Sequence, residues 1–133
     1  MRQTILKMKS LIGRLLMGEK RTNEEGIVLS LKYKNQKMGK LWFGKGKYYF
    51  EYDDSFKTTN LRPLTGFENL EVVYESAWLF TFFEMRIPDL KRADLAGVVK
   101  ANHLNSNSSP LRKLSIFGKQ TINDPYILTL EPA

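Results

Sequence analysis

The sequence predicts an α+β fold, an antiparallel β-meander sheet with several short helices packed on it and an amphipathic N-terminal helix before it. From residue 27 to residue 52, hydrophobic side chains recur at every second position, which is the period of a β-strand. Before this region, and at several places after it, they recur at the three- and four-residue spacing of a helix. Only two or three turn residues separate the strand-like runs, and connections this short join antiparallel neighbours.

The 133 residues suit one domain, since two halves would each be too small to bury a useful core. Hydrophobic residues make up 42% of the chain and aromatic residues 12%, which is enough apolar surface for folding. We assign residues 1–26 to a basic amphipathic helix and its linker, and residues 27–133 to the domain proper. The helix is expected over residues 3–17 and ends at Gly18. Its apolar stripe consists of Ile5, Met8, Leu11, Ile12, Leu15 and Leu16.

The first half of the domain is expected to be a three-stranded meander. The alternating pattern predicts strands over residues 27–34, 38–43 and 47–52. Asn35-Gln36 and Gly44-Lys45-Gly46 are the turn residues between them. The polar stretch 53–60 closes the meander.

The second half is expected to combine short helices with two further strands. In chain order the pattern predicts a strand over 70–74, a short buried helix over 76–85, a helix over 90–101, a helix over 110–117 and a last strand over 126–130. The aromatic content of 76–85 also suits a strand, and we prefer a helix because Ser76 can cap it. Ser109 and Pro110 are typical of a helix start, and Gly118 is placed to end that helix.

No residue pattern points to catalysis, to a cofactor or to a metal site. Cysteine is absent, which excludes disulfides, a thiolate nucleophile and cysteine-bound metal. The only histidine, His103, lies in a polar stretch without a neighbouring nucleophile or orienting carboxylate, so a solvated or capping role is expected. Gly39, Gly44 and Gly46 follow no phosphate-loop spacing. We therefore expect a protein that is not an enzyme and that binds no cofactor.

The formal net charge of +7 is unevenly distributed, because residues 1–57 are strongly basic and acidic groups predominate between 62 and 94. Such a field suits nucleic acid or an acidic protein partner, and also simple solubility. Residues 45–52 are similar to the basic aromatic strand of an RNA-recognition sheet, but three consecutive strands argue that these aromatics face the core.

The N-terminal helix has three possible partners: an anionic membrane surface, its own domain or another protein. No run of residues approaches the roughly 20 apolar positions that span a bilayer. No secretory cleavage site follows the basic start of the chain, so a cytoplasmic location is expected.

An ordered set of short motifs resembles the N-terminal subdomain of HipA-type serine/threonine kinase toxins, over roughly residues 27–130. The strands contribute a G-x-L step at Gly39-Lys40-Leu41 and an F-x-Y step at Phe50-Glu51-Tyr52. Arg62-Pro63-Leu64 is similar to the family's R-P-L-S step, with Thr65 in place of serine. Residues 82–94 follow its F-F-E-x-R-I-P-x-x-x-R-x-D stretch. Gly118-Lys119 and Asp124-Pro125-Tyr126 resemble the close of stand-alone versions.

Full-length HipA continues into a kinase domain, and this sequence stops before it. The resemblance is therefore to the separately encoded subdomain, called HipS in three-component HipB–HipS–HipT systems. It implies a non-catalytic antitoxin component that binds a HipT-like kinase and neutralises it by blocking its active site. It also implies a HipB-like helix-turn-helix protein in the complex, with DNA contacted only indirectly and no membrane. Two alternatives stay open: a structural subunit that completes the kinase complex without inhibiting it, and a basic nucleic-acid-binding module.

Four residues are candidates for contacts with the kinase: Phe67, Trp78, Arg62 and Arg86. A blocking protein needs exposed aromatic anchors with supporting charges, because aromatic and arginine contacts dominate interface energies. Phe67 lies in the expected loop after Leu64. Trp78 suits either an anchor or the core side of an aromatic helix, and Arg86 also suits a purely structural role in the junction after that helix.

Overall fold

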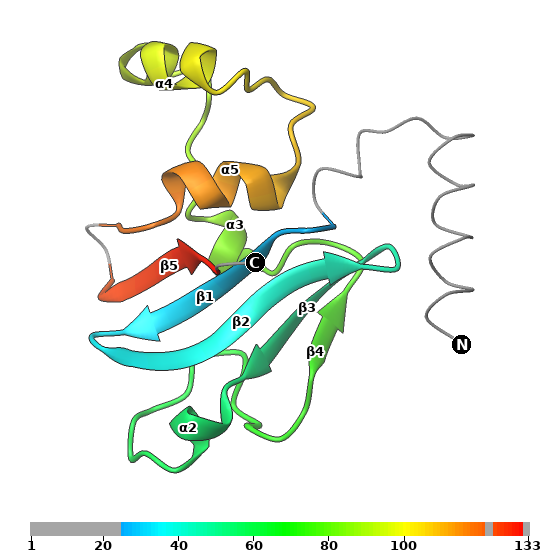
Figure 1. Ribbon diagram of the computed structural model, residues 1–133, viewed down its shortest axis with the longest axis vertical. Coiled ribbons are helices and arrows are strands. Elements are labelled where there is room, and N and C mark those ends of the chain that lie inside the picture. The colour runs from blue at the N-terminus through cyan, green and yellow to red at the C-terminus, as the bar shows by residue number, and fades with distance from the viewer. Residues whose placement is uncertain (1–24, 122–123, 132–133) are drawn as a thin grey trace.

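Five antiparallel strands form one sheet, in the order β4-β3-β2-β1-β5 (Figure 1). The computed structural model describes residues 25–121 and 124–131, so the expected N-terminal helix lies outside the described residues. The strands are β1 (Val28–Tyr33), β2 (Gln36–Gly44), β3 (Lys47–Tyr52), β4 (Tyr74–Ser76) and β5 (Tyr126–Leu130). Strands β1 to β4 form the meander in chain order, and β5 returns to pair with β1. The α+β class and the antiparallel sheet are confirmed.

Two tight turns connect the first three strands. Between β2 and β3, Lys45 and Gly46 have φ angles of 54° and 79°, which is the pair of positive values that a type I′ hairpin turn requires. Between β1 and β2 the turn residues are Lys34 and Asn35, one position earlier than expected, and Lys34 has a φ of 56°. The register of the pair shifts between Leu31 and Lys32, which places a β-bulge close to this turn.

The alternation of side chains places one face of the sheet against the core. Leu29, Leu31, Leu41 and Phe50 are fully buried on this face. The aromatics of β3 divide between the two faces, with Tyr48, Phe50 and Tyr52 buried as expected. Tyr49 points to the other face, where its ring stacks on Trp42 with 5.3 Å between ring centroids.

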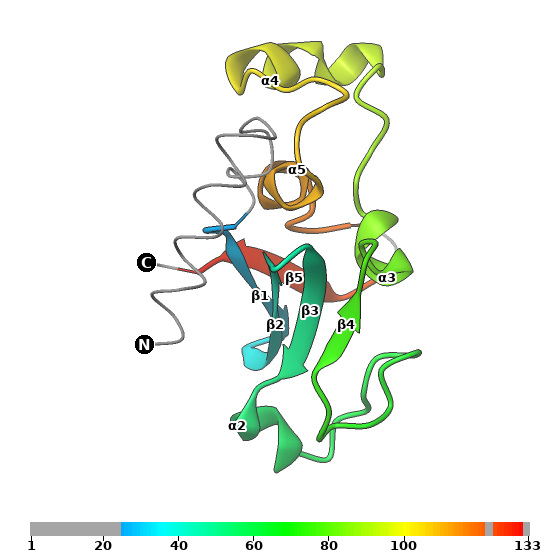
Figure 2. The ribbon, with the colours of Figure 1, turned by 90° about the vertical axis from the view of Figure 1, so that its right-hand side faces the viewer.

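Short helices cover the core face and the sheet ends. They are α2 (Asp54–Lys57), α3 (Thr81–Glu84), the 3₁₀ helix η2 (Ala93–Leu95), α4 (Ala96–Ala101) and α5 (Pro110–Phe117). The expected α5 is confirmed: Ser109 accepts a hydrogen bond from the Arg112 N–H, and Leu111 and Leu114 are fully buried in the core. Figure 2 shows α5 between the sheet and α4, which lies farther out. Helix α2, in the polar stretch after β3, was not expected.

Three of the expected elements are wrong in position. The strand expected over 70–74 is β4, at Tyr74–Ser76, because the preceding residues form a turn. In that turn the side chain of Asn69 accepts the Glu71 N–H, and the Tyr74 hydroxyl bonds to both backbone groups of Asn69.

The helix expected over 76–85 is reduced to the single turn of α3. Ser76 belongs to β4, and Phe80 keeps an extended backbone, with φ −61° and ψ 141°, as its ring packs against the core. The helix expected over 90–101 begins only at Ala93, because Asp89 accepts the Lys91 N–H in a turn after Pro88.

Gly39 marks a place where two strands leave no room for a side chain. A methyl group at this position would lie 2.4 Å from the Glu51 carbonyl oxygen and 2.9 Å from Cζ of Phe50. Gly44, in the same strand, has no heavy atom within 4 Å of the equivalent point.

We expect Gly39→Ala to lower the free energy of unfolding by about 1–3 kcal/mol, the usual cost of overpacking. Gly44→Ala is the matched control and should change it by about 0.5 kcal/mol or less. Urea unfolding of both variants measures the difference, and equal midpoints would show that the strands relax around the added methyl group.

Candidate functional site

Trp78 is the most exposed aromatic side chain that the structure describes, at 80% exposure. It follows β4 and precedes α3, and its backbone N–H donates to the Ser76 hydroxyl at 3.1 Å. The next two residues, Leu79 and Phe80, pack against the core. Two anchored neighbours and a hydrogen-bonded turn thus hold the backbone while the indole points away from the domain.

The Trp78 groove, as we call it, is an open depression of about 420 Å³ beside this indole. The β2–β3 hairpin and the start of α5 form two of its walls. The other walls are the segment between β4 and α3, the end of α3, and Ile87, which follows α3. The lining residues are Phe43, Tyr48, Ala77, Trp78, Leu79, Glu84, Ile87, Pro110 and Lys113. The lining is mostly apolar with one acidic and one basic side chain, a composition that suits protein side chains.

Phe67 is buried, at 5% exposure, and is not the exposed anchor that the sequence led us to expect. Its ring packs edge-on against Phe50, Tyr74 and Phe80, with centroid distances of 4.9 to 5.2 Å. Its carbonyl oxygen accepts a hydrogen bond of 2.6 Å from the Tyr52 hydroxyl. A ring at the centre of an aromatic cluster stabilises the core and presents no surface to a partner.

The Tyr52 hydroxyl fixes the long loop that contains Phe67. It donates to the Phe67 carbonyl and accepts the Leu64 N–H at 3.0 Å, so it ties both sides of the Thr65-Gly66 turn to β3. Burial raises the pKa of Tyr52 to about 12. The hydroxyl therefore stays protonated and remains a donor over the whole physiological range.

Arg86 is also buried, with 2% of its side chain exposed, and its guanidinium joins three segments. Nη1 donates to both carboxylate oxygens of Asp124 at 2.9 Å, Nε donates to the Gly118 carbonyl at 3.0 Å, and Nη2 donates to the Tyr126 carbonyl at 2.9 Å. We call this arrangement the Arg86 latch. Of the two roles that the sequence left open for Arg86, the geometry supports the structural one.

Arg62 is exposed and lies far from Trp78 along the sheet. It borders a second depression, of about 270 Å³, at the end of the sheet that carries the β1–β2 turn. The other lining residues are Tyr33, Met38, Phe56, Leu61, Pro125 and Tyr126. The four candidates therefore do not form one site: Trp78 and Arg62 face solvent at opposite ends of the sheet, and Phe67 and Arg86 are interior.

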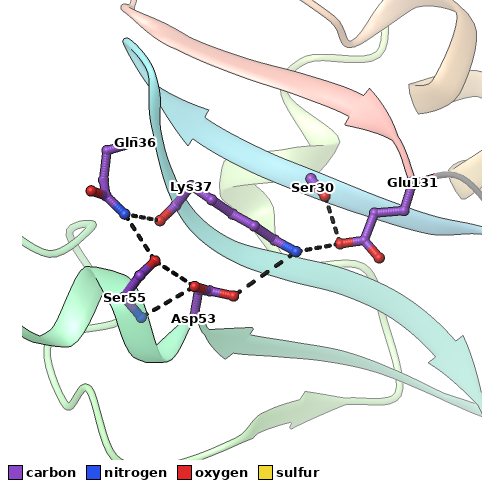
Figure 3. Close-up of polar contacts among 6 residues, drawn as sticks. All are labelled: Ser30, Gln36, Lys37, Asp53, Ser55 and Glu131. Carbon is purple, nitrogen blue, oxygen red and sulfur yellow. Dashed lines mark hydrogen bonds and ion pairs between the residues drawn. The ribbon is translucent and has the colours of Figure 1, made fainter.

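A polar cluster that the sequence analysis missed connects β1, β2, the start of α2 and the residue after β5 (Figure 3). Lys37 Nζ lies 2.5 Å from Glu131 Oε2 and 3.9 Å from Asp53 Oδ1. The Ser30 hydroxyl donates to the same oxygen of Glu131 at 2.7 Å. Hydrogen bonds from Lys37 and Ser30 lower the pKa of Glu131, and hydrogen bonds from Ser55 lower that of Asp53. The members are Ser30, Gln36, Lys37, Asp53, Ser55 and Glu131.

His103 has a backbone role at the end of α4. Its φ is 55°, its N–H donates to the Lys100 carbonyl, and the Leu104 N–H donates to the Val99 carbonyl at 2.9 Å. This is a Schellman motif, in which the residue after the cap takes a left-handed conformation. The capping role expected for His103 is confirmed in this sense.

Among residues 25–121 and 124–131, no three His, Cys, Asp or Glu side chains are grouped closely enough to hold a metal ion. In the same residues no helix has the length and apolar character to cross a membrane.

A comparison with protein-family models matches residues 29–122 to the HipA N-terminal domain. The chain belongs to this family. The match covers the meander, the aromatic loop with Phe67, α3 to α5 and the start of the return to β5, so Trp78, Arg62 and Arg86 all lie inside the HipA N-terminal domain. A comparison with curated proteins finds no match.

The buried latch of this HipA N-terminal domain gives a stability prediction. We expect Arg86→Lys to lower the free energy of unfolding by about 3 kcal/mol, because an ammonium group cannot bond the Asp124 carboxylate and two carbonyls in one plane. Arg92→Lys makes the same change in an exposed pair with Asp94 and should leave the unfolding midpoint close to that of the wild type. Denaturant unfolding of both variants measures this, and equal losses would contradict a special role for the latch.

The polar cluster gives a pH prediction. The folded-state pKa values of Asp53 and Glu131 lie below their unfolded values, so their contribution to stability is present above about pH 4.5 and is lost as the pH falls through the folded values. We expect Glu131→Gln to be less stable at pH 7 and to lose less stability between pH 7 and pH 3.

Urea midpoints measured across this pH range test the prediction. Lys37→Gln should have a similar effect, and the double variant should be less destabilised than the sum of the two single variants, because both act on one ion pair. Parallel pH profiles for the wild type and Glu131→Gln would show that the cluster does not contribute to the acid dependence.

Proposed function

We propose that this HipA N-terminal domain is a non-catalytic, HipS-like component of a toxin–antitoxin system that binds and neutralises a HipA-type serine/threonine kinase. Membership of the HipA N-terminal domain family supports association with such a kinase. The observation that carries the proposal is Trp78, which protrudes from a fixed backbone beside an apolar groove. A HipB-like helix-turn-helix protein would complete the complex and make its contacts with DNA.

The exposure of Trp78 is informative because of its surroundings. Single exposed apolar residues are common on protein surfaces and need no explanation. Here the indole borders a groove that its neighbours Leu79 and Ile87 also line, so one contiguous apolar surface is available. Tryptophan at the centre of such a surface is the residue type that most often dominates a protein interface.

The fixed backbone favours a contact that enters a cavity of the partner. Leu79 and Phe80 are held in the core, so the backbone that carries the indole loses little freedom when the complex forms. Glu84 and Lys113 lie at the groove and offer polar contacts around the apolar centre. A protruding tryptophan with a polar surround suits occupation of a cleft, and occupation of the kinase's active-site cleft is how we propose that neutralisation occurs.

Co-expression with a HipA-type kinase from the same genome tests the function. We expect the wild-type chain to co-purify with the kinase and to restore growth. Trp78→Ala should weaken the affinity by roughly 30-fold or more, as removal of an interface hot spot does. Its melting temperature should stay within about 3 °C of the wild type, because the side chain is exposed.

Met85→Ala is the matched control for this variant. Met85 is also 80% exposed and apolar, but it does not line the Trp78 groove. Equal binding by the two variants would contradict a specific role for Trp78. A stable complex in which the kinase stays toxic would identify a structural subunit, and the absence of any complex would contradict the proposed function itself.

A further inference from the structure

The two edges of the sheet differ in how their backbone groups are used. At the β5 edge, the Tyr126 N–H donates to the Asp124 carboxylate at 3.0 Å and the Tyr126 carbonyl accepts from Arg86. The Leu128 N–H donates to the Lys119 carbonyl at 3.0 Å. The outward-facing groups of these two β5 residues are thus largely occupied, and this edge is closed to a further strand.

The β4 edge has no such cover among the described residues. Strand β4 pairs only with β3, and Figure 1 shows it as the outermost labelled strand on its side of the sheet. An open edge presents unpaired N–H and C=O groups and accepts strands from other chains unless charges, prolines, bulges or short length protect it. Of these devices β4 has a short length, three residues, and the one charged side chain of Glu75.

The register identifies which backbone groups of β4 face outward. In the two-residue hairpin at Lys45-Gly46, the flanking residues Gly44 and Lys47 exchange both backbone bonds, and bonding alternates along an antiparallel pair. Tyr49, two residues after Lys47, therefore also bonds toward β2. Glu75 lies opposite Tyr49 across the β3–β4 pair, so its N–H and C=O point away from the sheet.

The side chains along this edge are apolar and acidic. Val72 and Val73 are 40% and 46% exposed, and Ala77 leads directly to Trp78. Glu71 and Glu75 are exposed, and they form ion pairs with Lys57 of α2 and Lys47 of β3. Pairing of β4 with β4 of a second copy would oppose acidic segments, and like charges directly opposite each other are destabilising. A strand that carries basic and apolar side chains fits better.

We propose that the outer edge of β4 accepts an extended segment of the kinase, bearing lysine or arginine next to apolar residues, as a sixth strand of the sheet. This inference rests on the proposed function and deepens it. Backbone hydrogen bonds to Glu75 align the segment, and the exposed valines and Trp78 contact its side chains. The indole in the groove and the strand at the edge then form one continuous surface, because Ala77 alone separates β4 from Trp78.

Glu75→Pro tests the inference against Glu75→Ala. Proline removes the outward N–H and leaves the β3–β4 bonds in place, since prolines are tolerated on edge strands where the N–H faces solvent. Both variants lose the exposed ion pair with Lys47. They therefore differ only in the backbone N–H of residue 75, which Glu75→Pro lacks, and in the proline ring. With the purified kinase, we expect Glu75→Pro to bind about tenfold or more weakly than Glu75→Ala.

Hydrogen–deuterium exchange on the wild-type chain provides a second measurement that needs no variant. Amides of residues 71–78 should exchange at least tenfold more slowly in the kinase complex than in the free chain. Equal binding by the two variants, or unchanged exchange in a complex that does form, would overturn the strand addition and leave the proposed function standing. Failure of the wild-type chain to bind the kinase would overturn both. A wild-type dimer that Glu75→Pro converts to a monomer would assign the edge to a second copy.

Discussion

The Arg86 latch joins the parts of the molecule that the chain itself connects only through long loops. Arg86 lies two residues after α3, and its guanidinium bonds to the residue that ends α5, to Asp124 and to the outer edge of β5. The charge is acceptable in this interior position because its fork of N–H groups meets a carboxylate and two carbonyls in good geometry. Together with the buried Phe83, Leu111 and Leu114, this side chain holds α3 and α5, which line part of the Trp78 groove, on the core face.

Aromatic residues perform two separate tasks in this domain, and neighbouring positions in the sequence divide between them. Phe67 and Phe83 pack against Phe50 in the core beneath the sheet, and Phe80 packs against Phe67 and Phe83 at its edge. Trp78 lies two residues before Phe80 and is almost fully exposed. The core cluster fixes the backbone at Trp78, so the position from which the exposed indole projects is set by the packing of its neighbours in the core.

Local patterns predicted the regular elements well. The alternation in β1 to β3 and β5 and the cap and proline of α5 are strong short-range signals, and the structure follows them. The segment 70–85 was misassigned because its aromatics are used for tertiary packing, which overrides helix and strand preference. The motif order identified the family, and the match over residues 29–122 confirms it. Exposure was harder to judge, because nothing in the sequence distinguishes the buried Phe67 from the exposed Trp78.

The polar cluster could not be predicted from the sequence, because its members are far apart in the chain. Lys37 and Glu131 are 94 positions apart, and no spacing rule connects them until the sheet order is known. The Arg86 latch likewise pairs residues 38 positions apart. Single-sequence reasoning found the arginine through its motif, but its partners required the fold.

The pairing of β1 with β5 has a consequence for the order in which the molecule is completed. Ser30 and Thr129 face each other across this pair, although almost the whole domain separates them in the chain. The meander from β1 to β4 uses neighbouring segments and can form while the ribosome is still adding residues, whereas β5 emerges last. Until then the edge of β1 is open. Pairing of β5 therefore covers an edge of β1 that is prone to aggregation while it is open. The nascent domain is exposed to this risk for the time that synthesis of the residues between β4 and β5 takes.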